Sequence, residues 1–349
     1  MVDSFTPNRT YGRASHNRNQ RIATNHRNAP PNVGFRCVVC SPMDPTQVFD
    51  LLSIGECLVE FSRRRDGTFR PAFAGDAVNT LFYAARLGLR TAYVSAVGDD
   101  LFTEMIVNGM QAEGIDLSHT LRLPGRRNGL YFIELDDAGH HHFHYWRNDS
   151  AATETLLHYS TERLTQFVRG SRTLLLSGIT LAVMKEPARL ISLLEAVAGT
   201  TTVVLDTNYR PQLWRTPEEY HRRIEAVIPY VDILLPSQAD LEMAWDGVQV
   251  EHLLWSFAEQ GVRTICMKAG ADGCALWRDG ELVWFRPPES VTVVDATGAG
   301  DAFNAGFIAA VLRGDTLQEA CDHGQKTAAH ALAVPGALNH AFGAEERPY

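Results

Sequence analysis

The sequence predicts an α/β fold, a doubly wound and mainly parallel sheet with a small second β-sheet as a lid. From about residue 49 onward, short apolar runs alternate with segments whose apolar residues recur every three or four positions. This alternation is typical of strands and helices that follow one another along the chain. Residues 128–148 break the pattern, because two apolar runs flank one polar turn there and indicate an antiparallel hairpin.

The first third of the chain supplies the opening strands and helices. Strands are expected at residues 49–56, 57–61, 69–73 and 92–97, and helices at residues 77–87 and 100–113. Gly88 and Gly114 follow the two helices, as glycine commonly does at a helix C-terminus. Lid strands are expected from about 57–75 and 127–148. A small sheet over the mouth of a large one would exclude water from a reaction site.

The remainder of the chain continues the alternation. Strands are expected at 173–177, 202–206, 231–235, 264–268 and 291–294, and helices near 186–198, 217–228, 250–260 and 301–312. Ligands of a doubly wound sheet bind at the carboxyl ends of its strands. The polar residues and glycines that follow these ends are Asp206, Asn208, Arg210, Ser237, Lys268, Gly270 and Gly273.

The stretch Asp295–Phe307 is a glycine-rich turn between the last predicted strand and helix. The first amides of a helix lack intrahelical acceptors and lie at the positive end of its dipole, so small residues there let an anion approach. The amides of Gly298, Ala299 and Gly300 are therefore predicted to stabilise a transferring phosphoryl group, with Asp301 as general base. The plainer alternative is an ordinary helix start. Aspartates on both sides of Thr-Gly-Ala-Gly favour the anion cradle.

Charge is unevenly distributed along the chain. The 349 residues carry a formal net charge of −9. Residues 1–42 hold six arginines and one acid, a net of +5, which leaves −14 on the remainder. Because the remainder of the chain is so acidic, it is a poor candidate for binding nucleic acid.

Residues 1–47 are rich in Asn, Arg, Thr and Pro and lack hydrophobic periodicity, which predicts a disordered extension before a domain at 48–345. Our leading interpretation places the true start at Met43. A transit peptide is the alternative, since the segment is basic and nearly free of acids. No apolar run is long enough to span a membrane and no secretory segment is present, so we expect a cytoplasmic protein.

The cysteines are expected to be reduced. They occupy positions 37, 40, 57, 266, 274 and 321. Cys37 and Cys40 form the one close pair in the sequence, and without a second pair or flanking histidines a zinc or redox role is disfavoured. The histidines between 140 and 144 are interpreted as part of an ordinary strand rather than as a metal site. Alternate side chains of a strand face opposite ways, so few of these histidines could share one face.

Two motifs together resemble a known family. Asp295–Phe307, with Ala-Gly-Asp-Ala-Val-Asn at 74–79, makes residues 49–340 similar to the ribokinase-like, or pfkB, carbohydrate kinases. The resemblance implies an α/β core with a sheet lid and the transfer of phosphate from Mg²⁺-ATP to a primary hydroxyl. Gly129–Glu134, His144–Asn148 and Asp206–Trp214 look like the family members that phosphorylate the C6 hydroxyl of 2-keto-3-deoxygluconate.

The resemblance also implies roles for individual residues. The expected substrate-binding residues are Gly75, Asn79, Tyr131, Tyr145, Arg147, Arg210 and Asp301. The expected ATP-binding residues are Asn208, Ser237, Lys268, Gly270, Gly273, Thr297, Gly298, Gly300 and Gln325. The two arginines suit a carboxylate, because a guanidinium binds it through charge-assisted hydrogen bonds. Many family members have Asn-x-x-Glu where this chain has Ser237-x-x-Asp240, so the glutamate's role does not transfer directly.

Other ligands and partners follow from the same resemblance. Mg²⁺ would arrive with ATP and be held mainly by phosphates and water, without a dedicated protein site. Whether a monovalent cation also binds stays open. The expected partners are a sugar acid, ATP and a second copy of the chain that pairs through the lid, whose edge strands would otherwise be exposed.

Three alternatives stay open. One is a kinase of the same family for a neutral sugar such as fructose, which would leave Arg147 and Arg210 without their anion. The second is a kinase for the epimer 2-keto-3-deoxygalactonate. The third is a nucleotide-binding regulator without catalysis, which the intact turn around Asp301 argues against.

Overall fold

The computed structural model describes residues 48–63, 66–135, 141–287 and 291–343. The predicted extension at 1–47, with Met43, Cys37 and Cys40, lies outside the described residues. So do residues 64–65, 136–140, 288–290 and 344–349, which include His140 and part of the polar turn predicted within residues 128–148.

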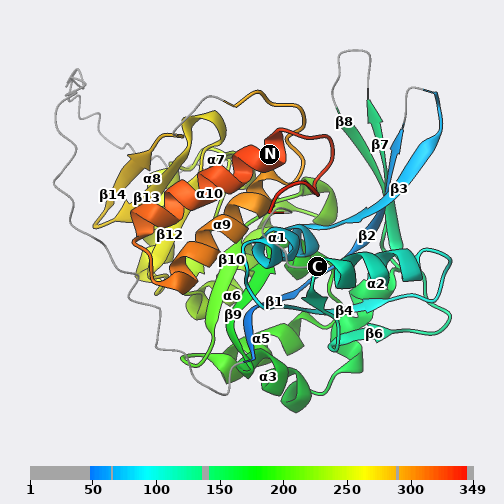
Figure 1. Cartoon of the computed structure of the whole chain (residues 1–349). Helices are drawn as coiled ribbons and strands as arrows, with labels where there is room; N and C mark the ends of the chain where they lie inside the picture. Colours follow the sequence, from blue (N-terminus) through cyan, green and yellow to red (C-terminus); the bar gives the residue numbers. More distant parts are fainter. Residues whose placement is uncertain (1–47, 64–65, 136–140, 288–290, 344–349) are drawn as a thin grey trace, which may run out of the picture. The chain divides into compact units, whose positions relative to one another are not determined.

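Ten strands of the described chain form the main sheet (Figure 1). In spatial order they are β14 (Glu281–Phe285), β13 (Cys274–Arg278), β12 (Thr264–Lys268), β11 (Ile233–Leu234), β10 (Thr202–Asp206), β9 (Ser171–Ser177), β1 (Phe49–Ile54), β4 (Thr91–Val97) and β5 (Ile115–Asp116), with β6 (Thr120–Arg122) also beside β4. Neighbours from β12 to β5 pair in parallel, whereas β13 pairs antiparallel with both β12 and β14. The predicted mainly parallel sheet is confirmed.

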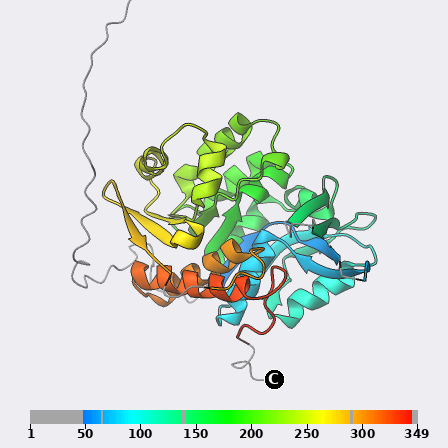
Figure 2. The same cartoon turned by 90° about the horizontal axis from the view of Figure 1, so that it is seen from above.

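Helices cover both faces of this sheet. The core on one face includes residues of α1 (Asp76–Arg86), α2 (Thr103–Ala112), α9 (Ala299–Arg313) and α10 (Leu317–Leu332). The core on the other face includes residues of α3 (Thr161–Arg169), α4 (Gly178–Val183), α5 (Pro187–Val197), α6 (Pro217–Val227), α7 (Gln238–Ala244) and α8 (Val250–Glu259). Short 3-10 helices η1 (Ala151–His158), η2 (Pro211–Leu213), η3 (Ile228–Tyr230) and η4 (Gly270–Asp272) complete the list. Figures 1 and 2 both place α9 and α10 side by side.

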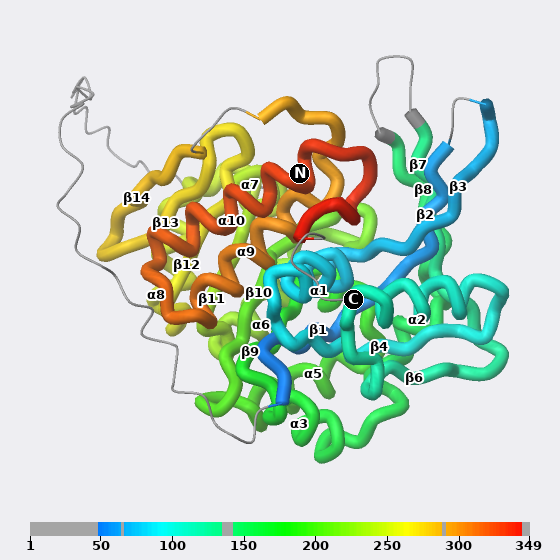
Figure 3. The backbone as a smooth tube through the Cα atoms, in the orientation of Figure 1, coloured from blue at the N-terminus to red at the C-terminus, as the bar shows by residue number. Residues whose placement is uncertain are grey.

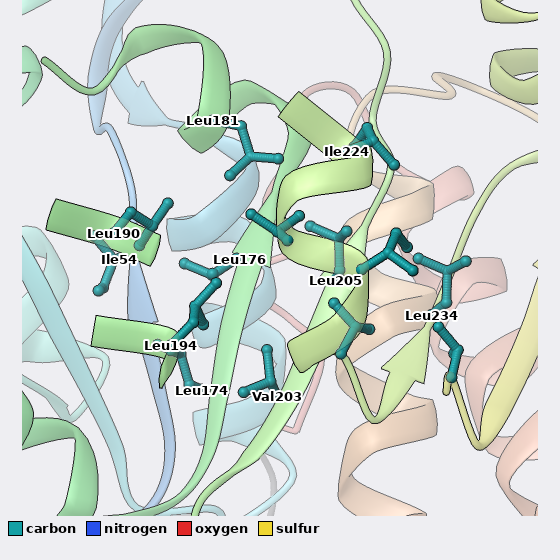
Figure 4. Close-up of a cluster of buried hydrophobic side chains, with 14 of the residues drawn as sticks. Ile54, Leu174, Leu176, Leu181, Leu190, Leu194, Val203, Leu205, Ile224 and Leu234 are labelled. Atoms are coloured by element: carbon teal, nitrogen blue, oxygen red, sulfur yellow. The ribbon is translucent and has the colours of Figure 1, made fainter. Parts of the chain in front are cut away.

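The strands are apolar on both sides, because each side meets a helical layer. Leu174, Leu176 and Leu205 pack in the core that includes α3 to α8, as the close-up in Figure 4 shows. The intervening Leu175 and Val204 belong to the core on the opposite face. This period of two within a continuous apolar run is typical of a parallel sheet buried on both faces.

A second sheet stands beside the main one (Figures 1 and 3). It contains, in spatial order, β3 (Phe69–Ala74), β2 (Leu58–Arg63), β7 (Gly129–Leu135) and β8 (His141–Trp146). The hairpin pairs β2–β3 and β7–β8 are antiparallel, and β2 and β7 join them in parallel. We call these four strands the lid. The separate small sheet predicted from the break in the α/β alternation is confirmed.

The strand predicted at 291–294 is wrong. These residues pair with no described strand, and Val293 and Val294 are 60% and 55% exposed. The Val294 amide instead donates to the carbonyl of Leu332 at the end of α10. An apolar run alone does not distinguish a buried strand from an extended segment beside a cleft, because both are short and apolar.

Neither the β13–β14 hairpin nor helix α10 was predicted, although the sequence carried a signal for each. Asp279 and Gly280, both at positive φ, form the two-residue turn between β13 and β14, and Asp-Gly is a strong hairpin signal. Thr316 and Glu319 form a capping box at the start of α10. Among the described helices, none combines the length and the apolar character needed to cross a membrane.

Candidate active site

A large cleft lies where the lid meets the carboxyl ends of the main-sheet strands. Its volume of about 1700 Å³ exceeds the roughly 300–1,000 Å³ of a typical single-ligand pocket, so it has room for two ligands. Every residue predicted to act in catalysis or binding lines it. These residues are Gly75, Asn79, Tyr131, Tyr145, Arg147, Asn208, Arg210, Ser237, Lys268, Gly270, Gly273, Thr297, Gly298, Ala299, Gly300, Asp301 and Gln325. The fold therefore brings the predicted set together, while the ligand of each residue stays a prediction.

The start of α9 is open toward the cleft. Gly298 caps the helix in the left-handed conformation, with φ of 76°, and no side chain caps its amides. Within the described chain, the amides of Gly300 and Asp301 have no hydrogen-bond acceptor, whereas Ala299 donates to the Ala296 carbonyl over 3.3 Å. The cradle thus presents unused N–H groups at the positive end of a helix dipole, which suits an anion such as phosphate.

Asp295 fixes the shape of this turn. Its Oδ1 accepts from the Thr297 amide at 2.9 Å and from the Thr297 hydroxyl at 2.7 Å. Its Oδ2 accepts from the amide of Gly336, beyond α10, at 2.8 Å. The first aspartate of the motif therefore holds the loop in place, and the Thr297 hydroxyl is already engaged by it.

Asp301 lies in the first turn of α9, beside the start of α1. Asn79 donates from Nδ2 to Asp301 Oδ2 at 2.8 Å, and the Asn79 amide donates to the Gly75 carbonyl at 2.7 Å. Burial raises the pKa of Asp301 to about 8, and the neighbouring carboxyl group of Asp76 acts in the same direction. A carboxyl group with such a pKa is suited to proton transfer near neutral pH.

This pKa predicts a pH dependence. A general base must be ionised before it accepts a proton, so we expect kcat/KM to fall as the pH drops below about 8, by up to tenfold per pH unit. The measurement is kcat/KM of the purified protein over about pH 5 to 10, with the coupling enzymes in excess at each pH. A profile that stays flat down to about pH 5 would contradict the raised pKa of the base.

Lys268 belongs to a buried polar network at the carboxyl ends of β10 and β12. Its Nζ donates to Asp206 Oδ2 at 2.7 Å and to Asn304 Oδ1 at 3.0 Å. Asn304 donates in turn to the same oxygen of Asp206 at 2.6 Å. A Cβ atom added to Gly300 would lie 3.7 Å from Lys268 Nζ, so the ammonium group adjoins the cradle. The network therefore holds the Lys268 ammonium group, paired with the Asp206 carboxylate, beside the proposed phosphate position.

The lining of the cleft also includes a buried amide that has no partner among the described residues. Gln325 on α10 is 8% exposed, and both its Oε1 and its Nε2 lack a hydrogen-bond partner in the structure. A Cβ atom on Gly273 would lie 2.7 Å from Gln325 Oε1 and 2.2 Å from the Phe285 carbonyl, so glycine is required there. A donor and an acceptor side by side in a cleft fit a ligand with complementary groups, such as a nucleobase.

Both candidate arginines already contact carboxylates. Arg147 donates from Nε to Glu56 Oε2 at 2.7 Å, and its Nη2 lies 2.5 Å from the same oxygen. Arg210 donates from Nη1 to the Tyr209 carbonyl at 2.8 Å and to Asp240 Oδ1 at 3.4 Å. Burial raises the pKa of Asp240. Asp240 also lines the cleft, at the position where the resemblance expects glutamate.

Two aromatic residues of the lid lie near Arg147 or beside its aromatic neighbour. Its guanidinium carbon lies 5.3 Å from the ring centre of Tyr145, and the rings of Tyr145 and Tyr131 are 5.4 Å apart. The Tyr131 hydroxyl donates to the buried carboxylate of Glu60. Tyr131 and Tyr145 pair across β7 and β8, so both face the cleft from one side of the lid.

The sequence prediction missed two acidic members of the site, Glu56 and Asp76, and also the pairing of Asp206 with Lys268. Glu56 follows β1 as Asp206 ends β10, so the carboxyl-end rule applied to the first strand would have found it. Asp76 lies between two predicted site residues. Their partners were not accessible from the sequence, because each is contributed by a distant segment.

Comparisons with known proteins agree with this fold. The chain belongs to the pfkB family of carbohydrate kinases, whose family model matches residues 48–341. The 2-dehydro-3-deoxygluconokinase of Dickeya dadantii (strain 3937) is 35% identical over 295 residues, covering 82% of this chain and 95% of that protein. The enzyme of the same name from Escherichia coli (strain K12) is 34% identical over 295 residues, with the same coverage of 82% and 95%.

A solved structure shows the same architecture. The PfkB protein from Polaromonas sp. JS666 superimposes with a TM-score of 0.73 at 25% identity, covering 85% of this chain and 99% of that one. The family resemblance drawn from the two motifs is thereby confirmed.

Proposed function

We propose that this carbohydrate kinase transfers the γ-phosphoryl group of ATP to the C6 hydroxyl of 2-keto-3-deoxygluconate, also called 2-dehydro-3-deoxygluconate. The observation that carries the proposal is one cleft in which Asp301 and the open start of α9 lie in common with Arg147 and Arg210. The names of the relatives that match most of the chain support the same substrate.

The proposed mechanism uses groups already in place. Asp301, oriented by Asn79, accepts the proton of the substrate hydroxyl as that oxygen attacks the γ-phosphorus. The amides of Gly298, Gly300 and Asp301 stabilise the transferring phosphoryl group, and Lys268 adds positive charge beside them. Gln325 is proposed to bind the adenine base through its two unpartnered amide atoms.

The residues of the cleft also fit Mg²⁺ bound with ATP. Mg²⁺ prefers oxygen ligands and keeps several of its waters, and the cleft offers the carboxylate of Asp240. Asp240 would hold the ion through water rather than as a dedicated ligand. When bound, the ion offsets negative charge on the phosphates.

A neutral sugar is the second candidate substrate, and a specific observation favours it. Arg147 and Arg210 each have a carboxylate partner within the protein, in Glu56 and Asp240. The 3.4 Å contact of Arg210 with Asp240 is long, and its side chain is 44% exposed, so a substrate carboxylate would compete for it. The acid is therefore the better supported substrate.

The test is an ADP-release assay of the purified protein with Mg²⁺-ATP and four sugars: 2-keto-3-deoxygluconate, 2-keto-3-deoxygalactonate, fructose and ribose. We expect turnover with the keto-deoxy acids at a kcat/KM at least 100-fold above that of the neutral sugars, because a site built around charged groups discriminates strongly against a ligand that leaves them unpaired. Preference for fructose or ribose would contradict the acid. Absence of turnover with every sugar would favour the non-catalytic regulator.

Pairing of two chains through the lid stays a prediction. Phe143 and Trp146 on the edge strand β8 are 39% and 60% exposed, which is consistent with a further contact at this edge.

A further inference from the structure

Glu56 occupies the place where the lid joins the main domain. It lies between the end of β1 in the main sheet and the start of β2 in the lid. A Cβ atom on Gly75, which follows β3, would lie 2.3 Å from the Glu56 carbonyl, and one on Gly129, which starts β7, would lie 3.0 Å from Glu56 Oε1. Arg147, directly after β8, contacts the carboxylate itself. The residue thus adjoins all four points at which lid strands leave or enter the main domain.

Both oxygens of the Glu56 carboxylate accept hydrogen bonds at this junction between the lid and the main domain, which we call the lid hinge. Its side chain is 1% exposed. Oε2 accepts from Arg147, and Oε1 accepts from the hydroxyl of Ser150 at 2.8 Å. Ser150 lies just before η1, so one buried group connects the end of the lid to the segment that follows it. Charge-assisted hydrogen bonds of this kind are roughly twice as strong as neutral ones.

The contact also determines how Arg147 is presented to the cleft. Nε and Nη2 both point to Glu56 Oε2, which fixes the plane of the guanidinium group. The ring of Tyr145, 5.3 Å from the guanidinium carbon, limits movement out of that plane. Among the described residues, Nη1 has no hydrogen-bond partner, and Arg147 lines the cleft. One nitrogen with a fixed direction therefore remains for a ligand.

We propose that Glu56 is a positioning residue for the substrate: from the lid hinge it holds Arg147 so that Nη1 binds the carboxylate of the sugar acid. The inference rests on the proposed function, because it requires a carboxylate in the substrate. It assigns selectivity for acids to the pair of Glu56 and Arg147 rather than to the arginine alone.

The experiment compares two substrates, 2-keto-3-deoxygluconate and its methyl ester, which differ in the charge of the carboxyl group. In Glu56→Gln, a neutral amide replaces the carboxylate at nearly the same volume, and the guanidinium loses its charged acceptor. We expect the ratio of kcat/KM for the acid to that for the ester to fall about tenfold, mainly through KM for the acid.

The matched control is Glu113→Gln. Glu113 forms a similarly buried pair with Arg86, at 2.8 Å with side chains 9% and 7% exposed, and it does not line the cleft. This variant loses a buried ion pair in the same way, so its melting temperature should also fall. The acid-to-ester ratio should stay within about twofold of wild type, since Arg147 forms its ion pair with Glu56 and not with Glu113.

A double-variant cycle separates positioning from general support of the fold. Arg147→Lys keeps the charge but loses the planar fork, so the acid-to-ester ratio should fall as in Glu56→Gln. Glu56→Gln combined with Arg147→Lys should then lower the ratio no further than Arg147→Lys alone, because Glu56 acts through Arg147. A further independent loss in the double variant would overturn the proposal.

The remaining outcomes distinguish the two proposals. Wild type that does not prefer the acid overturns the proposed substrate, and with it the role of Glu56. Wild type that prefers the acid, with an unchanged ratio in Glu56→Gln, overturns the role of Glu56 alone. An equal fall of the ratio in Glu113→Gln also overturns it, because the effect would then reflect lost packing.

Discussion

Asp301→Asn is expected to lower kcat by about 10²- to 10⁴-fold, with little change in KM for ATP. The amide keeps the acceptor oxygen for Asn79 Nδ2, which now lies 2.8 Å from Asp301 Oδ2, but it cannot accept the proton of the substrate hydroxyl. The measurement is steady-state kinetics of both proteins at about pH 8 and above, where the wild-type base is ionised. A variant that keeps more than about a tenth of the wild-type kcat would exclude Asp301 as the general base.

The same variant should be more stable than wild type at alkaline pH. The folded-state pKa of Asp301, about 8, lies above the ordinary unfolded value near 3.9, so the folded state binds the extra proton between these values. Wild-type stability therefore falls as the pH rises through this window, and Asp301→Asn removes that fall. Melting temperatures of both proteins, measured between about pH 4 and pH 9, test whether stability falls with rising pH in wild type alone.

Asp279→Asn is the matched control for this prediction. The substitution is the same change from aspartate to asparagine, but it lies in the β13–β14 turn, where the Asp279 side chain is 89% exposed. Its φ of 49° is left-handed, a conformation that asparagine tolerates well. Activity and melting temperature should both stay close to wild type.

Gly298→Ala is expected to lower kcat/KM by about 10²- to 10³-fold, comparable to the loss of one donor in an oxyanion site. The new Cβ would lie 2.8 Å from the Ala337 carbonyl oxygen and 3.0 Å from Ala337 Cβ. The backbone of the cradle must therefore shift, and its amides lose their direction toward the phosphoryl group. Kinetics with the substrate of the wild-type enzyme measure the effect.

Gly314→Ala, at the other end of the same helix, separates displacement of the cradle from backbone strain. Gly314 has φ of 87°, close to the 76° of Gly298, but a Cβ there meets no atom within 4 Å. Both substitutions carry the left-handed strain of about 1–2 kcal/mol, and only Gly298→Ala displaces the cradle. Equal losses of activity in the two variants would contradict the role assigned to the cradle.

Much of the site was predictable from short segments, because its geometry is local. The cradle from Asp295 to Asp301 depends on glycines, a helix start and an Asx turn that are all encoded within a few positions. The lid hairpin at 128–148 was predictable for the same reason, since the pairing of β7 with β8 spans a single turn. The strand predicted at 291–294 failed because its apolar residues lie beside the cleft, a fact that depends on the position of α10.

The sequence by itself therefore determined the fold class, the glycine-rich start of α9 and the predicted residues, all of which line the cleft. Only the tertiary structure decided which charges are paired. Glu56 and Arg147 are 91 positions apart, and Lys268 and Asp206 are 62 positions apart. The ionisation and direction of such groups depend on burial and on distant partners, as in Asp301 beside Asp76. Periodicity and motifs record neighbours along the chain, whereas these interactions form only when the sheet brings separate strand ends to one edge.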